Sequence, residues 1–298
     1  MPRLIRNVLI GFAMIAALLL IAGLVIAFCT PQPKPLPLPS PNGYDELVKA
    51  GNLVCDETAD HYTMKDEQLR STVLKNVEAL QIARGGFGHE SRIPFTSLNS
   101  LTNGAHSSDL SRLKRMAHAF VAEGQLGELE HRPQDAAQAY LDAIRLGHEG
   151  SRGGVIIDSL VGISIQAIGL MPLEKLQPNL DAKQCRQVAS ALEEMDSKRE
   201  PINEVFHTEK AWVRATYGWK ATFLQIISFR QLHASNQKYE NRMASIQKQT
   251  QRLAIACAAR AYELEHGEKP KTIEDLAPAY LKTVPKDAAT GQNLTLKQ

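Results

Sequence analysis

Asp158 is the residue of this chain whose surroundings make chemistry most plausible. It lies inside GGVIIDSLVGISIQAIGL, Gly153 to Leu170, a stretch that is apolar on all sides. An unpaired carboxylate in such surroundings is costly, so we expect Asp158 to be buried with a partner. Arg214, or another basic group from the helix after Pro201, is a candidate partner, and Glu209 is a candidate for the same network. A buried pair that fixes packing is favoured over a catalytic carboxylate.

The other reactive residue types give weaker signals. His207 and Glu209 are the nearest approach to a metal-binding pair, and the nine histidines form no HExxH or HxH motif. Ser164 lies in GISIQ, which lacks the closing glycine of a nucleophile elbow, and this predicts a core serine. We therefore predict no metal site and no cofactor, and the catalytic residues stay unknown.

The four cysteines are widely scattered and show no CxxC spacing. They therefore indicate no zinc site and no dense disulfide framework. The three that lie well beyond the N-terminal apolar run allow one internal pair at most, and the sequence does not say which. These three are Cys55, Cys185 and Cys257.

The N-terminus contains the segment around which the chain is organised. Val8 to Phe28 is an uncharged apolar run, long enough to cross the hydrocarbon core of a bilayer as a helix. Arg3 and Arg6 precede it, which predicts a cytoplasmic tip at residues 1–7 and a domain outside the cytoplasm. A cleaved signal peptide is the alternative, but its apolar region is normally shorter.

A proline-rich linker follows at residues 29–43. Six prolines between Pro31 and Pro41 predict an extended polyproline II spacer of roughly 30 Å. The formal net charge of +2 is matched by Arg3 and Arg6, so the part beyond the membrane is formally neutral. Nucleic acid binding, which needs a concentrated basic face, is therefore not expected.

Helical periodicity dominates residues 44–267 and predicts a mainly α-helical domain of roughly eight helices. We expect a surface loop from His89 to Asn103, a helix capped by Ser107 or Ser108, and a helix from Pro201 to about Ala234 with a kink near Gly218. Asp181 should cap another helix, and Gly267 should end the last long one. The Gly153–Leu170 helix is expected in the centre, with a second membrane span as the alternative.

One helical hairpin has a specific packing pattern. It is interrupted at residues 131–134, and its small and aromatic residues are Gly124, Ala136, Tyr140 and Ala143. This spacing resembles part of the tetratricopeptide consensus, in which small residues let two helices approach closely. The resemblance covers about one repeat, and any close-packed helical hairpin is the alternative.

The tail, residues 268–298, carries a second resemblance. Thr272 and Asp275 predict a short capped helix, and Asn293 to Lys297 a possible small strand. The tail pattern is Tyr262, Gly267, Pro270, Leu276, Tyr280-Leu281, Pro285-Lys286-Asp287 and Gly291. It resembles the C-terminal part of type II secretion pseudopilins and the same ending on membrane-anchored helical proteins of planctomycete-type bacteria. The resemblance implies a bacterial inner-membrane protein with a periplasmic domain, and it implies no activity.

These observations favour an interaction or scaffold protein held outside the cytoplasm by one membrane helix, with a possible protein partner. A membrane-anchored periplasmic hydrolase, with a site assembled from Asp158, His207 and Glu209, is one alternative. A pseudopilin-like accessory protein of a secretion apparatus is another. A deep pocket with two reactive groups within hydrogen-bond reach would indicate the hydrolase, and an open concave helical face would indicate binding.

Overall fold

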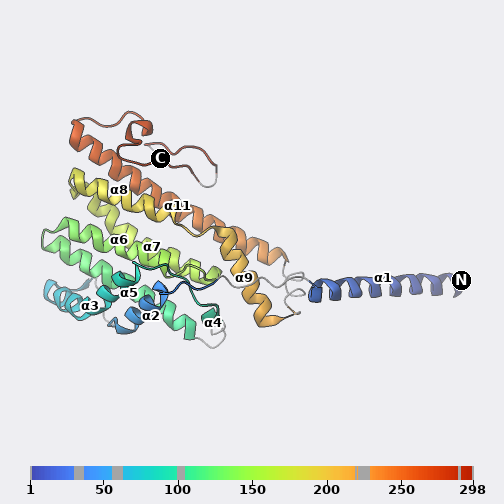
Figure 1. The fold of residues 1–298 in the computed structure, drawn as a ribbon. Helices are drawn as coiled ribbons and strands as arrows, with labels where there is room; N and C mark the ends of the chain where they lie inside the picture. The colour runs from blue at the N-terminus through green and yellow to red at the C-terminus, as the bar shows by residue number, and fades with distance from the viewer. Residues whose placement is uncertain are drawn as a thin grey trace.

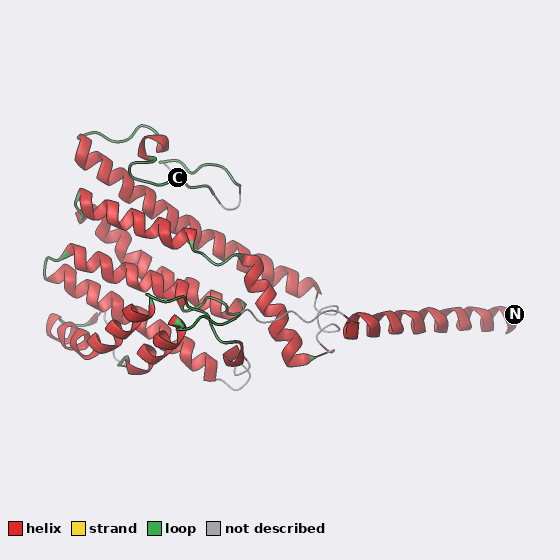
Figure 2. Cartoon of the chain, in the orientation of Figure 1, coloured by secondary structure: helices red, strands yellow, loops and turns green. Residues whose placement is uncertain are grey.

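The fold is mainly helical, as the computed structural model shows for residues 2–29, 37–55, 63–98, 105–218, 220, 229–287 and 290–296. Residues 30–36, in the first half of the predicted proline-rich linker, lie outside this description. Within the described ranges the only β-type pairing is an isolated antiparallel bridge between Lys286 and Asn293. Figure 2 shows helices joined by loops accordingly.

The predicted N-terminal anchor lies within a helix, α1, which spans Pro2–Cys29. Where side chains are described, one helical segment is long and apolar enough to cross a membrane, Ile156–Asn179, and the apolar part of α1 is the shorter Asn7–Leu18. This finding does not support α1 as the single membrane span, and it fixes neither topology nor orientation. The side chains of residues 24–29, at the end of the predicted span, lie outside the description.

The domain beyond the linker is a stack of antiparallel helices (Figure 1). The extensively packed pairs are α2 with α3, α5 with α6, α6 with α7, and α8 with α11. The helices are α2 (Gly43–Leu53), α3 (Asp66–Gly86), α4 (Phe95–Leu98), α5 (Ala105–Leu129), α6 (Pro133–Glu149), α7 (Ile156–Leu176), α8 (Ala182–Ser197), α9 (Ile202–Tyr217) and α11 (Phe229–His266). Two 3-10 helices, η3 (Gln177–Asn179) and η4 (Ile273–Leu276), complete them.

The α5/α6 hairpin is held at the spacing that the sequence indicated. A Cβ atom on Gly124 would lie 2.2 Å from Cε1 of Tyr140, so only glycine lets the ring pack against α5. Tyr140 is fully buried and donates a hydrogen bond to Glu128. Arg84 of α3 then joins both helices, since it bonds Glu123 of α5 and Asp142 of α6.

The apolar α7 lies in the middle of the stack, as expected for a central helix. It packs against α5, α6 and α11. Gly169 approaches the Tyr140 carbonyl of α6 so closely that an added Cβ would lie 2.7 Å from the oxygen. About 44% of its most apolar window is buried, so this candidate membrane span is also a packed helix of the domain.

Several helix boundaries follow their predicted signals. Asp181 caps α8 by accepting a hydrogen bond from the Gln184 amide at 2.7 Å, and Pro201 directly precedes α9. Gly267, with φ of 75°, ends α11. In each case a residue type in the local sequence indicates where the helix begins or ends.

Other boundaries were predicted incorrectly. The helix expected to begin after Ser107 or Ser108 begins earlier, with α5 at Ala105. The helix expected to run to about Ala234 with a kink near Gly218 is interrupted at that glycine, where α9 ends at Tyr217 and Gly218 turns the chain with φ of 56°. The supposed surface loop from His89 carries a buried Ile93, whose amide donates to the Arg152 carbonyl, and residues 99–104 of it are outside the description.

The tail folds back onto α8 and α11. Ile273, Leu276, Leu281 and Leu294 are buried in the main core. Thr272 and Asp275 cap η4, as predicted, and the expected strand at Asn293 is reduced to the single bridge with Lys286. The tail is therefore part of the helical domain and not a separate appendage.

Candidate functional site

Asp158 is fully buried, and its basic partner is His106 of α5. The His106 Nε2 atom lies 2.5 Å from Asp158 Oδ1, and both side chains have no exposed surface. The other carboxylate oxygen accepts a hydrogen bond from the Val155 amide at 2.8 Å. The described partners of Asp158 thus come from α5 and from the start of α7, and Arg214 of α9 is not among them.

Glu209 lies near Asp158 at the N-terminus of α7 but bonds a backbone amide there and not the Asp158 side chain. Its Oε2 accepts the Ile156 amide hydrogen bond at 2.9 Å, while Glu200 accepts that of Gly153 at 3.0 Å. Three carboxylates therefore satisfy amides around the first turn of α7, where the helix dipole favours negative charge. Burial raises the pKa of Glu209, and the charge of Asp158 raises it further.

This polar centre is sealed. Tyr44 of α2 is 2% exposed beside it, and burial, with the charge of Asp158 next, raises the pKa of its hydroxyl. The Tyr44 hydroxyl and His106 Nδ1 are buried without a hydrogen-bond partner in the described structure. A substrate would have to open the helix stack to reach His106 or Asp158. The arrangement can hold α5, α7 and α9 in register.

The remaining predicted candidates do not assemble with this centre. His207 is exposed on α9. The Ser164 hydroxyl donates to the Val161 carbonyl of its own helix at 2.7 Å. The described residues contain no group of three or more His, Cys, Asp or Glu side chains placed to hold a metal. Cys185 and Cys257 are buried thiols, and Cys55 accepts a hydrogen bond from the Asn76 side-chain amide at 3.2 Å.

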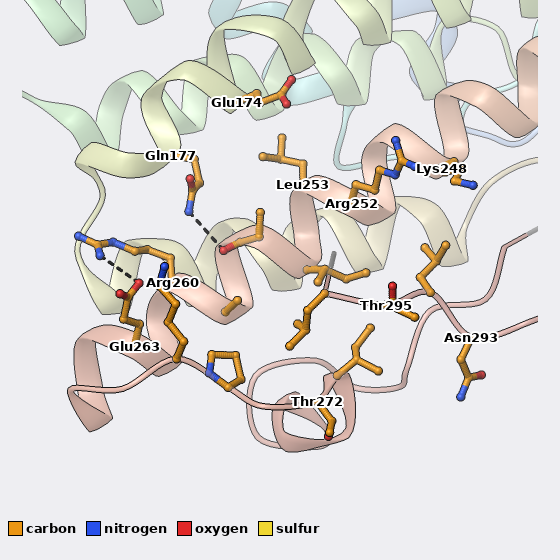
Figure 3. Close-up of a pocket in the computed structure, with 18 of the residues that line it drawn as sticks. Glu174, Gln177, Lys248, Arg252, Leu253, Arg260, Glu263, Thr272, Asn293 and Thr295 are labelled. Atoms are coloured by element: carbon orange, nitrogen blue, oxygen red, sulfur yellow. Dashed lines mark hydrogen bonds and ion pairs between the residues drawn. The ribbon is translucent and has the colours of Figure 1, made fainter. Parts of the chain in front are cut away.

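A large open groove lies elsewhere, between the end of α7, one face of α11 and the tail. Its volume is about 1520 Å³. Figure 3 shows Glu174 and Gln177 on one side and Thr272, Asn293 and Thr295 on the other. Gln177 ties the two helices together, because its amide donates to the Ala256 carbonyl of α11 at 3.2 Å.

The groove has apolar and charged lining residues in contact with one another. The apolar ones are Leu253, Ile255, Ala256, Ala259, Ile273, Leu294 and Leu296. The charged ones are Lys248, Arg252, Arg260, Lys269, Lys271, Glu174, Glu263 and Glu274. Arg260 pairs with Glu263 at 3.3 Å, and Lys248 pairs with Asp287 of the tail at 2.7 Å. Binding clefts combine apolar area with a small number of polar groups, and this groove carries more charge than that usual composition.

Arg186 of α8 latches the tail in the position that forms this groove. Its guanidinium lies 3.9 Å from the centre of the Tyr280 ring, and it donates to the Ala279 carbonyl at 2.8 Å. It also forms a two-bond ion pair with Glu265 of α11, and these hydrogen bonds lower the pKa of Glu265 to about 2. Tyr280 donates to the same carboxylate at 2.6 Å.

Sequence reasoning missed both His106 and the groove. His106 stood next to a predicted loop, one residue before the expected helix cap, and nothing local marks it as a partner for a residue 52 positions away. The groove exists because the tail returns to α11. The apolar residues of the tail did signal that return, but not where it would leave a cleft.

Comparison of the chain with protein-family models, curated proteins and solved structures finds no match. The geometry alone therefore defines the class of protein. It is a helical stack with a sealed polar centre and an open groove, one side of which is formed by the C-terminal tail.

Proposed function

We propose that this chain is a membrane-anchored, extracytoplasmic interaction protein that holds a segment of a partner protein in the groove between α7, α11 and the tail. The observation that carries the proposal is the separation of the two sites. The reactive pair His106 and Asp158 is sealed, whereas the groove of about 1520 Å³ is open and lined by apolar and charged groups. A stack of helical hairpins, one of which resembles a tetratricopeptide unit, suits such a role.

The surface of α1 supports the anchor. Phe12 is 73% exposed, Leu18 65% and Leu9 64%, with no part of the described domain over them. A helix with apolar side chains on all sides is stable in lipid rather than in water. Arg3 and Arg6 favour a cytoplasmic N-terminus and a single pass through a bacterial inner membrane, with the domain in the periplasm.

The hydrolase alternative has less support, because Asp158 is fully buried and His207, another residue of its expected site, is exposed on α9. The secretion-apparatus alternative keeps one specific observation: the pseudopilin-like tail forms a wall of the groove through Lys269–Glu274 and Asn293–Leu296. A component of such an apparatus is therefore one possible occupant within the proposed function.

Site-specific photocrosslinking in native membranes tests the groove. A crosslinking residue at Arg252, which lines the groove, should give a discrete adduct, and one at Leu74 of α3, 72% exposed, should not. Ala256→Trp, which fills the groove, should abolish the adduct, while Leu74→Trp should leave it. Equal adducts from Arg252 and Leu74, or none from Arg252, would argue against the groove as the binding site.

A further inference from the structure

The second half of α9 has the composition of a membrane-interface segment. Residues 210–220 read KAWVRATYGWK, with three basic residues, three aromatic residues and no acid. Both tryptophans of the chain, Trp212 and Trp219, lie in this stretch, although Trp219 is outside the described residues. Trp and Tyr concentrate at bilayer interfaces, and Lys and Arg bind anionic headgroups.

The two halves of α9 differ in how they are held. The first half is fixed by buried Val205, by the Phe206 ring, which meets Tyr239 of α11 at 5.7 Å, and by the Glu209 bond to α7. After Ala211 no described side chain of α9 is fully buried. Trp212 is partly buried and still packs against the main core, while residues 215–217 are exposed, so α9 projects from the stack only at its last turn.

The second half of α9 presents aromatic and basic groups together. Tyr217 is 44% exposed and meets the Trp212 ring edge to face at 6.4 Å. Lys210 and Lys220 are exposed, and Arg214 is partly exposed. Gly218 then turns the chain, with no atom within 4 Å of the position that a Cβ would take there.

This half of α9 also lies at the appropriate end of the molecule. In Figure 1 α9 occupies the end of the domain from which α1 extends, while the tail lies over the opposite half.

We propose that Lys210–Tyr217 lies in the headgroup region of the bilayer that holds α1, and binds anionic lipid there. This inference rests on the proposed anchoring by α1. The aromatic rings supply the contact with the acyl boundary, and the basic side chains supply the attraction to phosphate. The contact fixes the orientation of the domain and directs the tail and its groove away from the membrane.

Fluorescence quenching of the full chain tests this contact. Trp219→Phe leaves Trp212 as the single tryptophan, and the variant is reconstituted into phosphatidylcholine and phosphatidylglycerol vesicles with brominated acyl chains. Because brominated chains quench only fluorophores at the membrane, we expect the Trp212 emission to fall about twofold relative to vesicles without bromine. Lys210→Glu with Arg214→Glu should restore it, and the matched reversal Lys114→Glu with Lys183→Glu, at exposed positions on α5 and α8, should not.

Flotation of the same samples separates the two proposals. Protein that floats with the vesicles while Trp212 stays unquenched would overturn the α9 contact and leave the anchor standing. Quenching that is equal in the Lys210→Glu/Arg214→Glu variant would also overturn it, since the basic side chains would then contribute nothing. Protein that does not float would overturn both the contact and the anchoring on which it rests.

Discussion

His106 Nε2 lies 2.5 Å from Asp158 Oδ1, and this contact joins the start of α5 to the start of α7 across 52 residues of sequence. Both side chains are fully buried, so the pair has been taken out of water completely. Buried polar pairs of this kind contribute modestly as a pair but are costly to break on one side, because the remaining group is stranded. Asp158 is thus best understood as a structural residue.

Asp158→Ala should lower the free energy of unfolding by about 3–5 kcal/mol, because it strands His106 and the Val155 amide. Asp158→Asn keeps the shape and can still accept from Val155, so it should cost less. Urea denaturation followed by circular dichroism measures both. An alanine variant as stable as the wild type would contradict the structural role.

His148 of α6 should make the domain sensitive to acid. Burial, and then the charges of Arg199 and Arg152, hold its pKa well below the usual value. The folded state therefore binds a proton less readily than the unfolded state, so stability is complete above a pH of about 6.5 and falls below it, by at most about 1.4 kcal/mol per pH unit.

His148→Leu should remove that loss, which is measured as the difference between wild-type and variant unfolding free energies from about pH 8 to pH 5. The comparison is needed because Glu200 and Glu209, whose pKa values are raised by burial, have the opposite effect: their protonation stabilises the folded state. Both carboxyl groups are present in the wild type and in the variant, so their contributions cancel in the difference between the two unfolding free energies. A difference that does not change with pH would show that His148 does not titrate in this way.

Gly124→Ala should destabilise the domain by about 1–3 kcal/mol, because the new Cβ would overlap the Tyr140 ring and force α5 and α6 apart. Gly85→Ala in α3 is the matched control, since nothing lies within 4 Å of its Cβ position. That control should be neutral or up to about 1 kcal/mol stabilising, as alanine favours helix. Equal melting temperatures for the two variants would refute the close contact.

The helical class, the α5/α6 hairpin, the cap at Asp181 and the stop at Gly267 were predictable, because each depends on residues within one or two helical turns. The partner of Asp158 was not. The sequence showed that a carboxylate in an apolar helix needs a partner, but His106 and Arg214 were equally compatible with that need. His106 is the partner because α5 packs against α7, and this contact is visible only in the structure.

The groove shows the same limit on a larger scale. Buried Leu276 and Leu281 were recognisable as residues too apolar for a linker, and they do pack into the core. The ion pair between Arg186 and Glu265 was not predictable, because the two residues lie 79 positions apart and nothing near Arg186 in the sequence marks the pairing. Cavities arise from such long-range placements, so their position is not encoded in any local pattern.

The anchor can be tested on intact cells. Because α1 has an exposed apolar surface and Arg3 and Arg6 precede it, protease added to spheroplasts should degrade the domain, and carbonate washing should leave the chain in the membrane. Release of the intact domain by carbonate would remove the anchor, and protection from protease would reverse the orientation.

Removal of the tail should destabilise the whole domain and not only the groove. Truncation after Gly267 exposes the core against which Ile273, Leu276, Leu281 and Leu294 pack. Since each fully buried side chain contributes about 1.5–3 kcal/mol, the loss should reach several kcal/mol and give a clearly lower melting temperature or insoluble protein.

Two single variants separate packing from the latch. Leu276→Ala should cost about 2–5 kcal/mol, whereas Leu264→Ala, at a side chain 43% exposed on α11, should change little. Arg186→Met removes the exposed ion pair with Glu265, whose net worth is small, so it should leave global unfolding nearly unchanged. It should nevertheless speed hydrogen exchange in residues 279–282, because Arg186 holds the Ala279 carbonyl and the Tyr280 ring. If residues 279–282 exchange as slowly in Arg186→Met as in the wild type, the buried apolar side chains alone hold the tail, and Arg186 is not its latch.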